Sequence, residues 1–422
     1  MSGKNWSQLL NEALAVCSIG HIPHDKTISK QTFGFGPEAL NIVGDENRRR
    51  LDQVLDQLLD SSIGESLSKQ KMISLIVPIL HEKKIKGETF DKAGGELFKK
   101  NLEALPVVEH KVLRDIYGAS IANSQKPVTL ACFTIYDWAR HKSIITGLGD
   151  KDDSWVWHDE KHGLLAECKV LARDTQKAME LADALFSRLE LIIKFMIGHR
   201  TDRFDVGVLN HRGSKISRSY VFTEKNISSN HAVKGAIESI PLDDNYFKNP
   251  SPPFAKLLGI LEKQSTAFQK KILRSAEWTG QAMSDPNPAS AFIKAATALE
   301  VLFSANEKGV ITPSIMAQIS ESCAHILGDT AESSVEMEKT VKMLYGTRSA
   351  VVHFGKDEVS QQDLNTFIFI SRSVVMALLS KPEFSAVDSI EKLYEMLRLR
   401  KYSGAMVGGR VATTSVGATK GK

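Results

Sequence analysis

An arginine and a histidine toward the C-terminal end of the sequence have the chemistry needed to act on a phosphate group. Arg348 lies on the apolar stripe of a helix predicted over 333–352, together with four aliphatic residues: Val341, Leu344, Val351 and Val352. A guanidinium on such a face is rarely left without a partner. His353 follows five positions later, just before Phe354 and Gly355. An arginine can hold a phosphate through two parallel hydrogen bonds, and a histidine can transfer a proton near neutral pH.

The spacing of these two residues limits how they can cooperate. Five positions on a regular helix separate two side chains by about 140°. Arg348 and His353 can therefore converge only if the helix ends or loosens there, which Gly355 permits. The spacing alone favours a structural ion pair for Arg348 and a helix-capping role for His353. Any catalytic role depends on the elements around them.

A second pair of histidines, His158 and His162, has the four-residue spacing that places two zinc ligands on one helix face. Glu180 could supply a third ligand. However, Asp159 stands where a zinc protease has its catalytic glutamate, and the strand-like segment after Gly163 argues against a helix. We therefore interpret these residues as a polar turn rather than a metal site.

Three weaker patterns have simpler interpretations. His21 and His24 bracket Pro23 in a predicted loop, and this pair alone does not indicate a metal site. The segment 118–122 (GASIA) only partly matches a nucleophile elbow, because alanine replaces its second glycine. Trp155 and Trp157 fall on one side of a predicted strand, where packing is favoured over base stacking. The sequence contains neither a Walker A motif nor G-x-G-x-x-G, so it does not support a phosphate-binding loop.

Hydrophobic periodicity predicts a mainly α-helical chain with an α/β middle region. In residues 1–120, apolar spacings of three and four predict helices over 5–16, 51–59, 70–80, 93–104 and 107–117. Residues 121–249 form the mixed region, with one long amphipathic helix over 174–197. The strands predicted around this helix span 128–136, 163–171, 204–209 and 215–223.

After a run of prolines at 250–253, nearly every segment is helical. Three prolines in four residues cannot continue a helix or a central strand, so the run predicts a linker and a domain boundary. Short loops then separate predicted helices over 255–283, 289–304, 313–327, 333–352, 361–380 and 386–399. This pattern is typical of an antiparallel helical bundle over 255–400. A glycine-rich flexible tail is predicted over 401–422.

The composition excludes several classes of protein. Of the 422 residues, 42% are hydrophobic and 25% are charged, which is typical of a globular chain and excludes extended disorder. No run of about 18 uncharged apolar residues is present, so no membrane span is predicted. The polar, amphipathic segment after Met1 and the four scattered cysteines predict a soluble cytoplasmic protein with reduced core thiols and no bound metal.

The charge balance argues against broad coating of nucleic acid. The formal net charge is +4, and the four basic residues of the last 22 positions account for all of it. The body of the chain is therefore about neutral. Extensive, charge-driven binding to a phosphate backbone needs more basic residues than this. A small local RNA site stays compatible with the composition.

The helical region resembles the HEPN superfamily, and more narrowly the Apea-like HEPN group, named from abortive phage infection proteins. The resemblance covers about 264–380. It is carried by the segment 271–278 (KILRSAEW), the helix 291–303 with its Ala-Leu-Glu, a helix pair, Arg348-x-x-x-x-His353 and one more long helix. The predicted strand-helix-strand over 164–223 is similar to what precedes the bundle in such proteins.

The resemblance implies a metal-independent endoribonuclease of anti-phage defence that needs no cofactor. It assigns catalysis to Arg348 and His353, with His353 as general base or acid. It also implies a homodimer or higher homo-oligomer through the bundle, so that two motifs line one cleft. The expected partners are tRNA or mRNA as substrate and a regulatory or phage-derived trigger protein, which the regions before the bundle would sense.

Two supporting residues leave alternatives open. Many family members carry Asn, Asp or His directly after the arginine, where this sequence has Ser349. Glu300 could orient Arg348 or form a plain interhelical salt bridge. The alternative function is a non-catalytic HEPN-like dimerisation, interaction or sensor protein, in which Arg348 serves packing alone.

Overall fold

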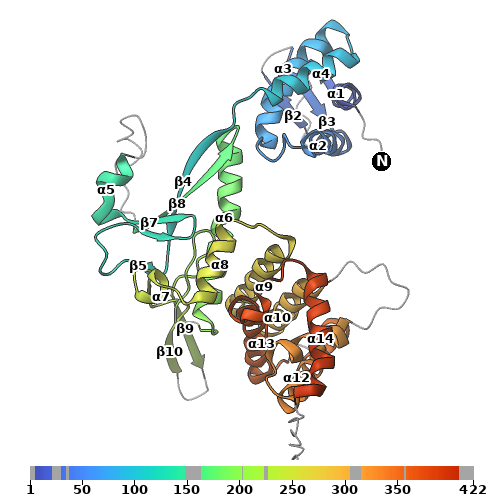
Figure 1. Ribbon diagram of the computed structural model, residues 1–422. Coiled ribbons are helices and arrows are strands. Elements are labelled where there is room, and N and C mark those ends of the chain that lie inside the picture. The colour runs from blue at the N-terminus through green and yellow to red at the C-terminus, as the bar shows by residue number, and fades with distance from the viewer. Residues whose placement is uncertain are drawn as a thin grey trace, which may run out of the picture. The chain divides into compact units, whose positions relative to one another are not determined.

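The computed structural model describes residues 5–20, 30–34, 38–147, 163–201, 203–222, 227–304, 315–355 and 358–407 (Figure 1). These residues divide into two compact units. Unit 1 contains residues 1–113 and 167–185, and unit 2 contains residues 114–166 and 186–422. Most described residues are helical, as predicted from the periodicity.

Unit 1 packs four helices against a small antiparallel sheet. The helices are α1 (Trp6–Ala15), α2 (Asp45–Leu59), α3 (Lys69–Lys86) and α4 (Lys92–Glu103). The strands, in spatial order, are β1 (Cys17–Ile19), β3 (Leu40–Val43) and β2 (Lys30–Phe33). The predicted apolar face of α2 is confirmed, because Leu51, Val54, Leu55 and Leu58 are buried in the core of this unit.

A second sheet has the strand order β4-β8-β7-β6. Its strands are β4 (Val108–Ile116), β6 (Val128–Leu130), β7 (Phe133–Asp137) and β8 (Leu164–Ala172). Strands β6 and β7 pair as an antiparallel hairpin. The long helix α6 (Thr175–Ile197) follows β8, and β4, β8 and α6 each contribute residues to both units.

The remaining α/β elements of unit 2 are short. The short strands β5 (Ala119–Ser120) and β11 (Ile240–Pro241) pair in parallel. The strands β9 (Lys215–Phe222) and β10 (Ile227–Lys234) form an antiparallel hairpin. Two helices complete this part, α5 (Trp138–Thr146) and α7 (Asn245–Lys248).

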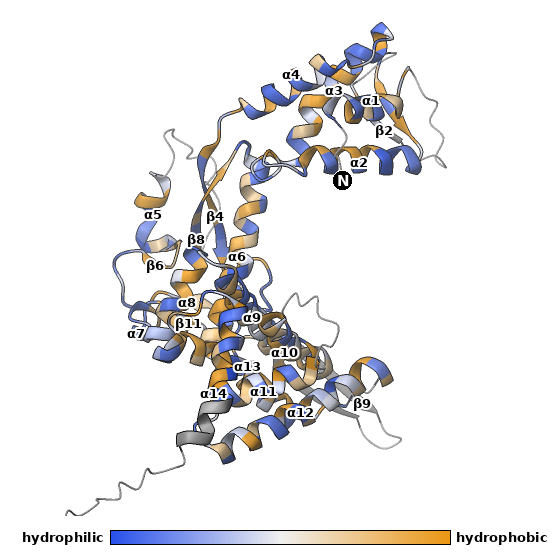
Figure 2. Cartoon of the chain, turned by 45° about the vertical axis from the view of Figure 1, so that its right-hand side comes forward, coloured by the Kyte–Doolittle hydropathy of each residue, from blue (hydrophilic) through white to orange (hydrophobic). Residues whose placement is uncertain are grey.

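From Pro252 onward the described residues form helices only. The α-helices are α8 (Pro252–Glu262), α9 (Ala267–Ser284), α10 (Pro288–Phe303), α11 (Ile315–Leu327), α12 (Ala331–Phe354), α13 (Gln361–Ser380) and α14 (Ile390–Val407). A short 3₁₀ helix, Pro382–Phe384, precedes α14. Hydrophobic and hydrophilic residues alternate along α12 in Figure 2, as expected for a helix with one buried side.

Helix α13 is the centre of this helical region, because it packs against α8, α9, α10, α11 and α12. Its Phe367 is fully buried and lies 4.9 Å from Phe292 of α10 between ring centroids. Among the described residues, α13 is also the one helix long and apolar enough to cross a membrane. The central helix of a helical bundle meets the same two criteria, and much of α13 is buried against its neighbours.

The structure corrects several predicted elements. Residues 107–117 do not form a helix, because this segment becomes β4 in the sheet order next to β8. The sheet β1-β3-β2 was not predicted, so the first 120 residues are not purely helical. Residues 204–209 form isolated bridges rather than a strand. The helix predicted over 255–283 is two helices, because the chain is extended at Lys263 and α9 begins anew after its cap at Thr266.

The proline run does not separate compact units. Pro252 and Pro253 occupy the first positions of α8, where a proline is tolerated because its missing N–H has no partner within the helix. Helix α8 packs against α9 and α13, so the boundary predicted at 250–253 lies inside unit 2. Residues 401–407 belong to α14 rather than to the predicted tail, and 408–422 lie outside the described residues.

Candidate functional site

Helix α12 carries both residues of the arginine-histidine motif. The helix begins after Thr330, whose hydroxyl accepts the N–H of Ser333 in a capping box, and it ends at Gly355 with φ of 63°. A glycine adopts this left-handed conformation without steric penalty. Because the helix stays continuous through Phe354, His353 lies inside its last turn and not beyond it. The loosening that would let Arg348 and His353 converge within one chain does not occur.

Arg348 forms the predicted interhelical contact with Glu300 of α10. Its Nη2 lies 3.2 Å from Glu300 Oε1 and 3.5 Å from Oε2. Each of the two side chains keeps 27% of its surface exposed. The Nε of Arg348 is buried and has no hydrogen-bond partner among the described residues. Glu300 therefore contacts the guanidinium, while about a quarter of the Arg348 side chain stays exposed.

Tyr345 lies one turn before Arg348 and was not predicted as part of the site. Its hydroxyl donates a hydrogen bond of 3.2 Å to the carbonyl oxygen of Ala296, and its ring meets that of Phe367 edge to face. Burial raises the pKa of Tyr345 well above its usual value; the nearby Glu300 carboxylate adds to the increase, and the Arg348 charge opposes it. Its position on the helix stripe of Arg348 was the signal available in the sequence.

His353 occupies the opposite environment, because it is exposed at the end of α12. It makes no hydrogen bond or ion pair with another described residue. Ser349 is also exposed, and a spacing of four positions sets it only about 40° from His353 around the helix. Phe354, with 84% of its surface exposed, follows His353 directly. The structure thus brings Arg348 to Glu300 and places Ser349 with His353.

The other residues that the sequence analysis considered, and did not favour as sites, either have a partner elsewhere or lie outside the described part of the chain. The second group comprises His21, His24, Trp155, Trp157, His158, Asp159 and His162. Glu180, considered as a third ligand, lies on α6 and pairs with Lys177 at 3.8 Å. Among the described residues no three His, Cys, Asp or Glu side chains gather as a metal site.

The segment 118–122 does not form a nucleophile elbow. Gly118 has φ of 70° in the turn between β4 and β5, and Ser120 belongs to β5 rather than to a strand-to-helix turn. The described cysteines are free thiols, as predicted, and burial raises the pKa of Cys17 to about 11. A protonated thiol of this kind is a poor nucleophile and a poor metal ligand near neutral pH.

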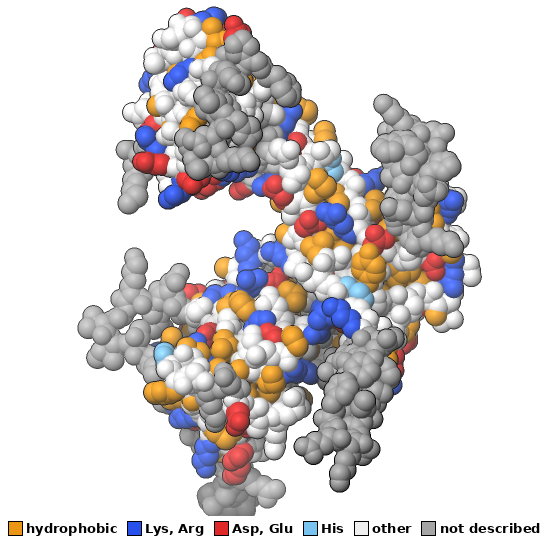
Figure 3. Space-filling model, turned by 180° about the vertical axis from the view of Figure 1, so that it is seen from behind, with side chains coloured by type: hydrophobic (Ala, Val, Ile, Leu, Met, Phe, Trp, Pro, Cys, Tyr) orange, Lys and Arg blue, Asp and Glu red, His pale blue; other side chains and the backbone are white. Residues whose placement is uncertain are grey.

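The face of the molecule in Figure 3 is not dominated by one sign of charge. In Figure 3, basic side chains form small groups interspersed with acidic and hydrophobic ones on the face shown. This distribution fits the formal net charge of +4 for the whole chain. The face shown carries no extended basic surface of the kind that attracts a long phosphate backbone.

No family model, no curated protein and no solved structure matches this chain. The resemblance to the HEPN superfamily consequently rests on the motif residues in α9, α10 and α12 and on the order of these helices.

Proposed function

We propose that this chain is a metal-independent endoribonuclease of HEPN type that cleaves RNA in anti-phage defence. The observation that carries the proposal is the composition of α12. This helix holds a partly exposed arginine, whose guanidinium contacts Glu300, and an exposed histidine at its C-terminal end. Together they provide a phosphate ligand and a group that moves protons near neutral pH.

A second copy of the chain completes the site. Arg348 and His353 point about 140° apart on one continuous helix, so one chain does not place both on the same phosphate. A homodimer in which two α12 helices face one another would bring the arginine of one copy to the histidine of the other. Exposed residues around the helix end suit such an interface: Met343, Gly346, Ser349, Val352, Phe354 and, from α13, Phe369.

The proposed reaction uses a nucleophile that RNA itself supplies. His353 accepts the proton of the ribose 2′-OH, and the 2′ oxygen attacks the adjacent phosphorus. The bond from phosphorus to the 5′ oxygen breaks as that oxygen takes a proton from water, and His353 later returns its own proton to the solvent. Arg348 neutralises charge on the non-bridging oxygens in the transition state. The products are a 2′,3′-cyclic phosphate and a 5′-hydroxyl.

The proposed biological setting follows from the resemblance. The substrate is tRNA or mRNA of a cell under phage attack, and the reaction takes place in the cytoplasm. The regions that precede the helical bundle sense a trigger or restrain the nuclease until infection. A regulatory or phage-derived protein is the proposed trigger.

A non-catalytic dimerisation or sensor protein is the second candidate, and a specific observation favours it. Arg348 already has a carboxylate partner, and its Nε is buried. In that case α12 serves assembly alone, and Ser349 stands where many nucleases of this type carry Asn, Asp or His.

Incubation of the purified chain with total tRNA and a long RNA in EDTA distinguishes the two candidates. The nuclease proposal predicts fragments that end in 2′,3′-cyclic phosphate and begin with 5′-hydroxyl. Fragments with 3′-hydroxyl ends, or cleavage that EDTA abolishes, would contradict the proposed chemistry.

A further inference from the structure

Unit 2 contains an open cleft that the arginine-histidine motif does not use. Four segments line it. They contribute Arg200, Thr201, Phe204, Asp205 and Arg212 after α6, Gly235 and Ala236 after β10, Met283–Pro286 at and after the end of α9, and Gln361 at the start of α13. Its volume is about 490 Å³. A neighbouring cavity of about 540 Å³ shares Arg212, Ser284, Asp285 and Pro286 with it. Volumes of this order accommodate a ligand the size of a nucleotide.

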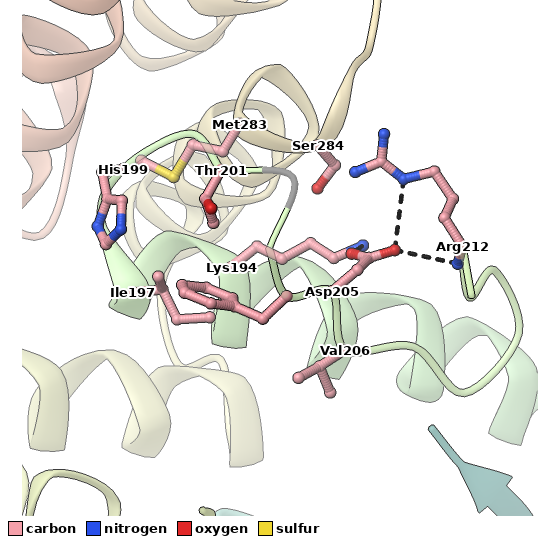
Figure 4. Close-up of a pocket in the computed structure, with 10 residues that line it drawn as sticks. Lys194, Ile197, His199, Thr201, Asp205, Val206, Arg212, Met283 and Ser284 are labelled. Atoms are coloured by element: carbon pink, nitrogen blue, oxygen red, sulfur yellow. Dashed lines mark hydrogen bonds and ion pairs between the residues drawn. The ribbon is translucent and has the colours of Figure 1, made fainter. Parts of the chain in front are cut away.

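The acidic groups around the cleft are already engaged. Asp205 pairs with Lys194 at 2.9 Å and with Arg212 at 3.4 Å, so one carboxylate serves two cations. Figure 4 shows these side chains, with the Arg212 guanidinium extending beyond Asp205 on the side of Ser284. Asp285 pairs with Lys294 at 2.5 Å.

A third carboxylate, Glu190, is stabilised by hydrogen bonds from backbone N–H groups. It is buried and accepts hydrogen bonds from the N–H groups of Val208, Leu209 and Asn210. Among the described residues that line the two cavities, the four cations therefore exceed the three carboxylates. The excess lies at the two arginines, because each lysine has a carboxylate within 3 Å.

Arg200 is the least satisfied of these cations. Its Nη2 donates to the main-chain oxygen of Asp285 at 2.8 Å rather than to a carboxylate. Its Nη1 is buried with no hydrogen-bond partner among the described residues. Burial lowers the pKa of Arg200, and the charge of Arg212 lowers it further, while Asp285 opposes both effects. Arg200 and Arg212 thus line the same cleft with charges that repel each other, and such a pair favours the binding of an anion there.

We propose that this cleft binds the phosphoryl group of a nucleotide, with Arg200 and Arg212 as its ligands. An anion bound between the two guanidinium groups offsets the repulsion between their charges. The cleft admits one nucleotide unit, either a free nucleotide or one residue of an RNA strand. Gln361, the first residue of α13, adds the positive end of a 20-residue helix to the wall.

The test measures binding to the full-length chain, independently of any cleavage. The probes are ATP, a fluorescein-labelled 2′-O-methyl RNA decamer and adenosine. The decamer resists cleavage through the 2′ oxygen, so its binding does not depend on nuclease activity. At least one phosphorylated probe should bind, and adenosine should bind at least about tenfold more weakly, as expected for a lost charge-assisted hydrogen bond.

Arg212→Ala is the main variant, because its side chain is 44% exposed and its loss leaves Asp205 paired with Lys194. It should weaken binding of the phosphorylated probe by about tenfold or more. Arg203→Ala is the matched control from the same segment, since Arg203 is 67% exposed and pairs with Glu238 away from the cleft. The control should bind like the unaltered chain.

Arg200→Gln tests the second ligand, and circular dichroism confirms that each variant is folded. Binding of ATP alone assigns the site to free nucleotides, and binding of the decamer alone assigns it to an RNA strand. The proposal is overturned if neither phosphorylated probe binds at millimolar concentration. It is also overturned if folded Arg212→Ala binds as tightly as the Arg203→Ala control.

Discussion

At the scale of single residues, the contact between Arg348 and Glu300 decides how the arginine can act. The pair joins α12 to α10 at 3.2 Å and is partly exposed. A buried ion pair would leave an uncompensated charge when one partner is removed, and the loss of stability would be large. A partly exposed pair contributes little to stability, so its main effect is to fix the orientation of the guanidinium.

Glu300→Gln should therefore affect activity more than stability. We expect the free energy of unfolding to fall by less than about 1 kcal/mol, measured by urea titration. We expect the rate of RNA cleavage to fall by about tenfold, because a neutral amide holds the guanidinium less firmly. Glu338→Gln is the control, since Glu338 forms an exposed ion pair with Lys342 within α12, the helix that carries Arg348. A stability loss of several kcal/mol in Glu300→Gln alone would instead identify a structural salt bridge.

Tyr345 links the site to the core of the bundle and gives stability a pH dependence. Its neutral form is favoured in the folded state, because burial raises its pKa above the usual value near 10. The stabilisation is complete below about pH 10. Above this pH the unfolded chain loses the phenol proton while the folded chain keeps it, so stability falls as the pH rises.

Tyr345→Phe should remove this contribution at the cost of one hydrogen bond. We expect it to lower the free energy of unfolding at pH 7 by about 1 kcal/mol, because the bond to Ala296 is lost. Between pH 9 and pH 11 its stability should fall less steeply than that of the unaltered chain. Urea titrations at three pH values check this expectation, and parallel slopes would show that Tyr345 does not govern the alkaline loss.

At the scale of elements, hydrophobic periodicity predicted the long helices correctly. It gave the wrong element where pairing with a distant strand determines the secondary structure. Helix α13 spans 361–380 as predicted. The ends of α6 and α10 lie within one residue of their predicted positions. Residues 107–117 were predicted as a helix because their apolar residues also fit helical spacing. The segment instead became β4 in the second sheet, and strand formation of this kind depends on packing against neighbours more than on local preference.

The continuity of α12 could not be derived from the motif either. The sequence allowed Gly355 to end the helix early or late, and the side-chain directions of Arg348 and His353 depend on that choice. The structure places the end after Phe354. The contact of Arg348 with Glu300 was one of two roles considered from the sequence, whereas Tyr345 and the cleft of Arg200 and Arg212 depend on contacts between segments far apart in the chain.

The exposed face of α12 yields a prediction about assembly. A side chain added at Gly346 meets no atom of the same chain within 4 Å, so Gly346→Leu should leave the fold intact. If a second α12 helix packs closely here, the leucine prevents that approach. We expect the unaltered chain to sediment as a dimer or larger species at micromolar concentration, and Gly346→Leu to shift it toward the monomer.

Gly259→Leu is the matched control for assembly. Gly259 is also a helical glycine with open space around its Cα, but it lies on α8. The Gly259→Leu variant should sediment like the unaltered chain. An unaltered chain that remains monomeric in the presence of RNA would contradict the composite site, and equal effects of both leucines would place the interface elsewhere.

At the scale of the whole molecule, the division of the chain differs from the one that composition predicted. The proline run at 250–253 has the composition of a linker, yet it lies inside unit 2. Arg372 of α13 shows why, because its guanidinium donates to the main-chain oxygens of Phe195 and Met196 at the end of α6. The helical region is therefore bound to residues that precede the prolines. A local composition signal cannot reveal such a contact between distant segments.

The central claim is that His353 transfers a proton during metal-independent cleavage of RNA. The most direct measurement compares the unaltered chain with His353→Ala and Lys342→Ala, each incubated with total tRNA in EDTA. Lys342 is an exposed residue of the same helix and serves as the control. Loss of general acid–base catalysis should slow cleavage by about 10²–10⁴-fold in His353→Ala, while Lys342→Ala should retain full activity. Circular dichroism establishes that both variants are folded. A folded His353→Ala protein that cleaves tRNA as fast as the unaltered chain would contradict the claim.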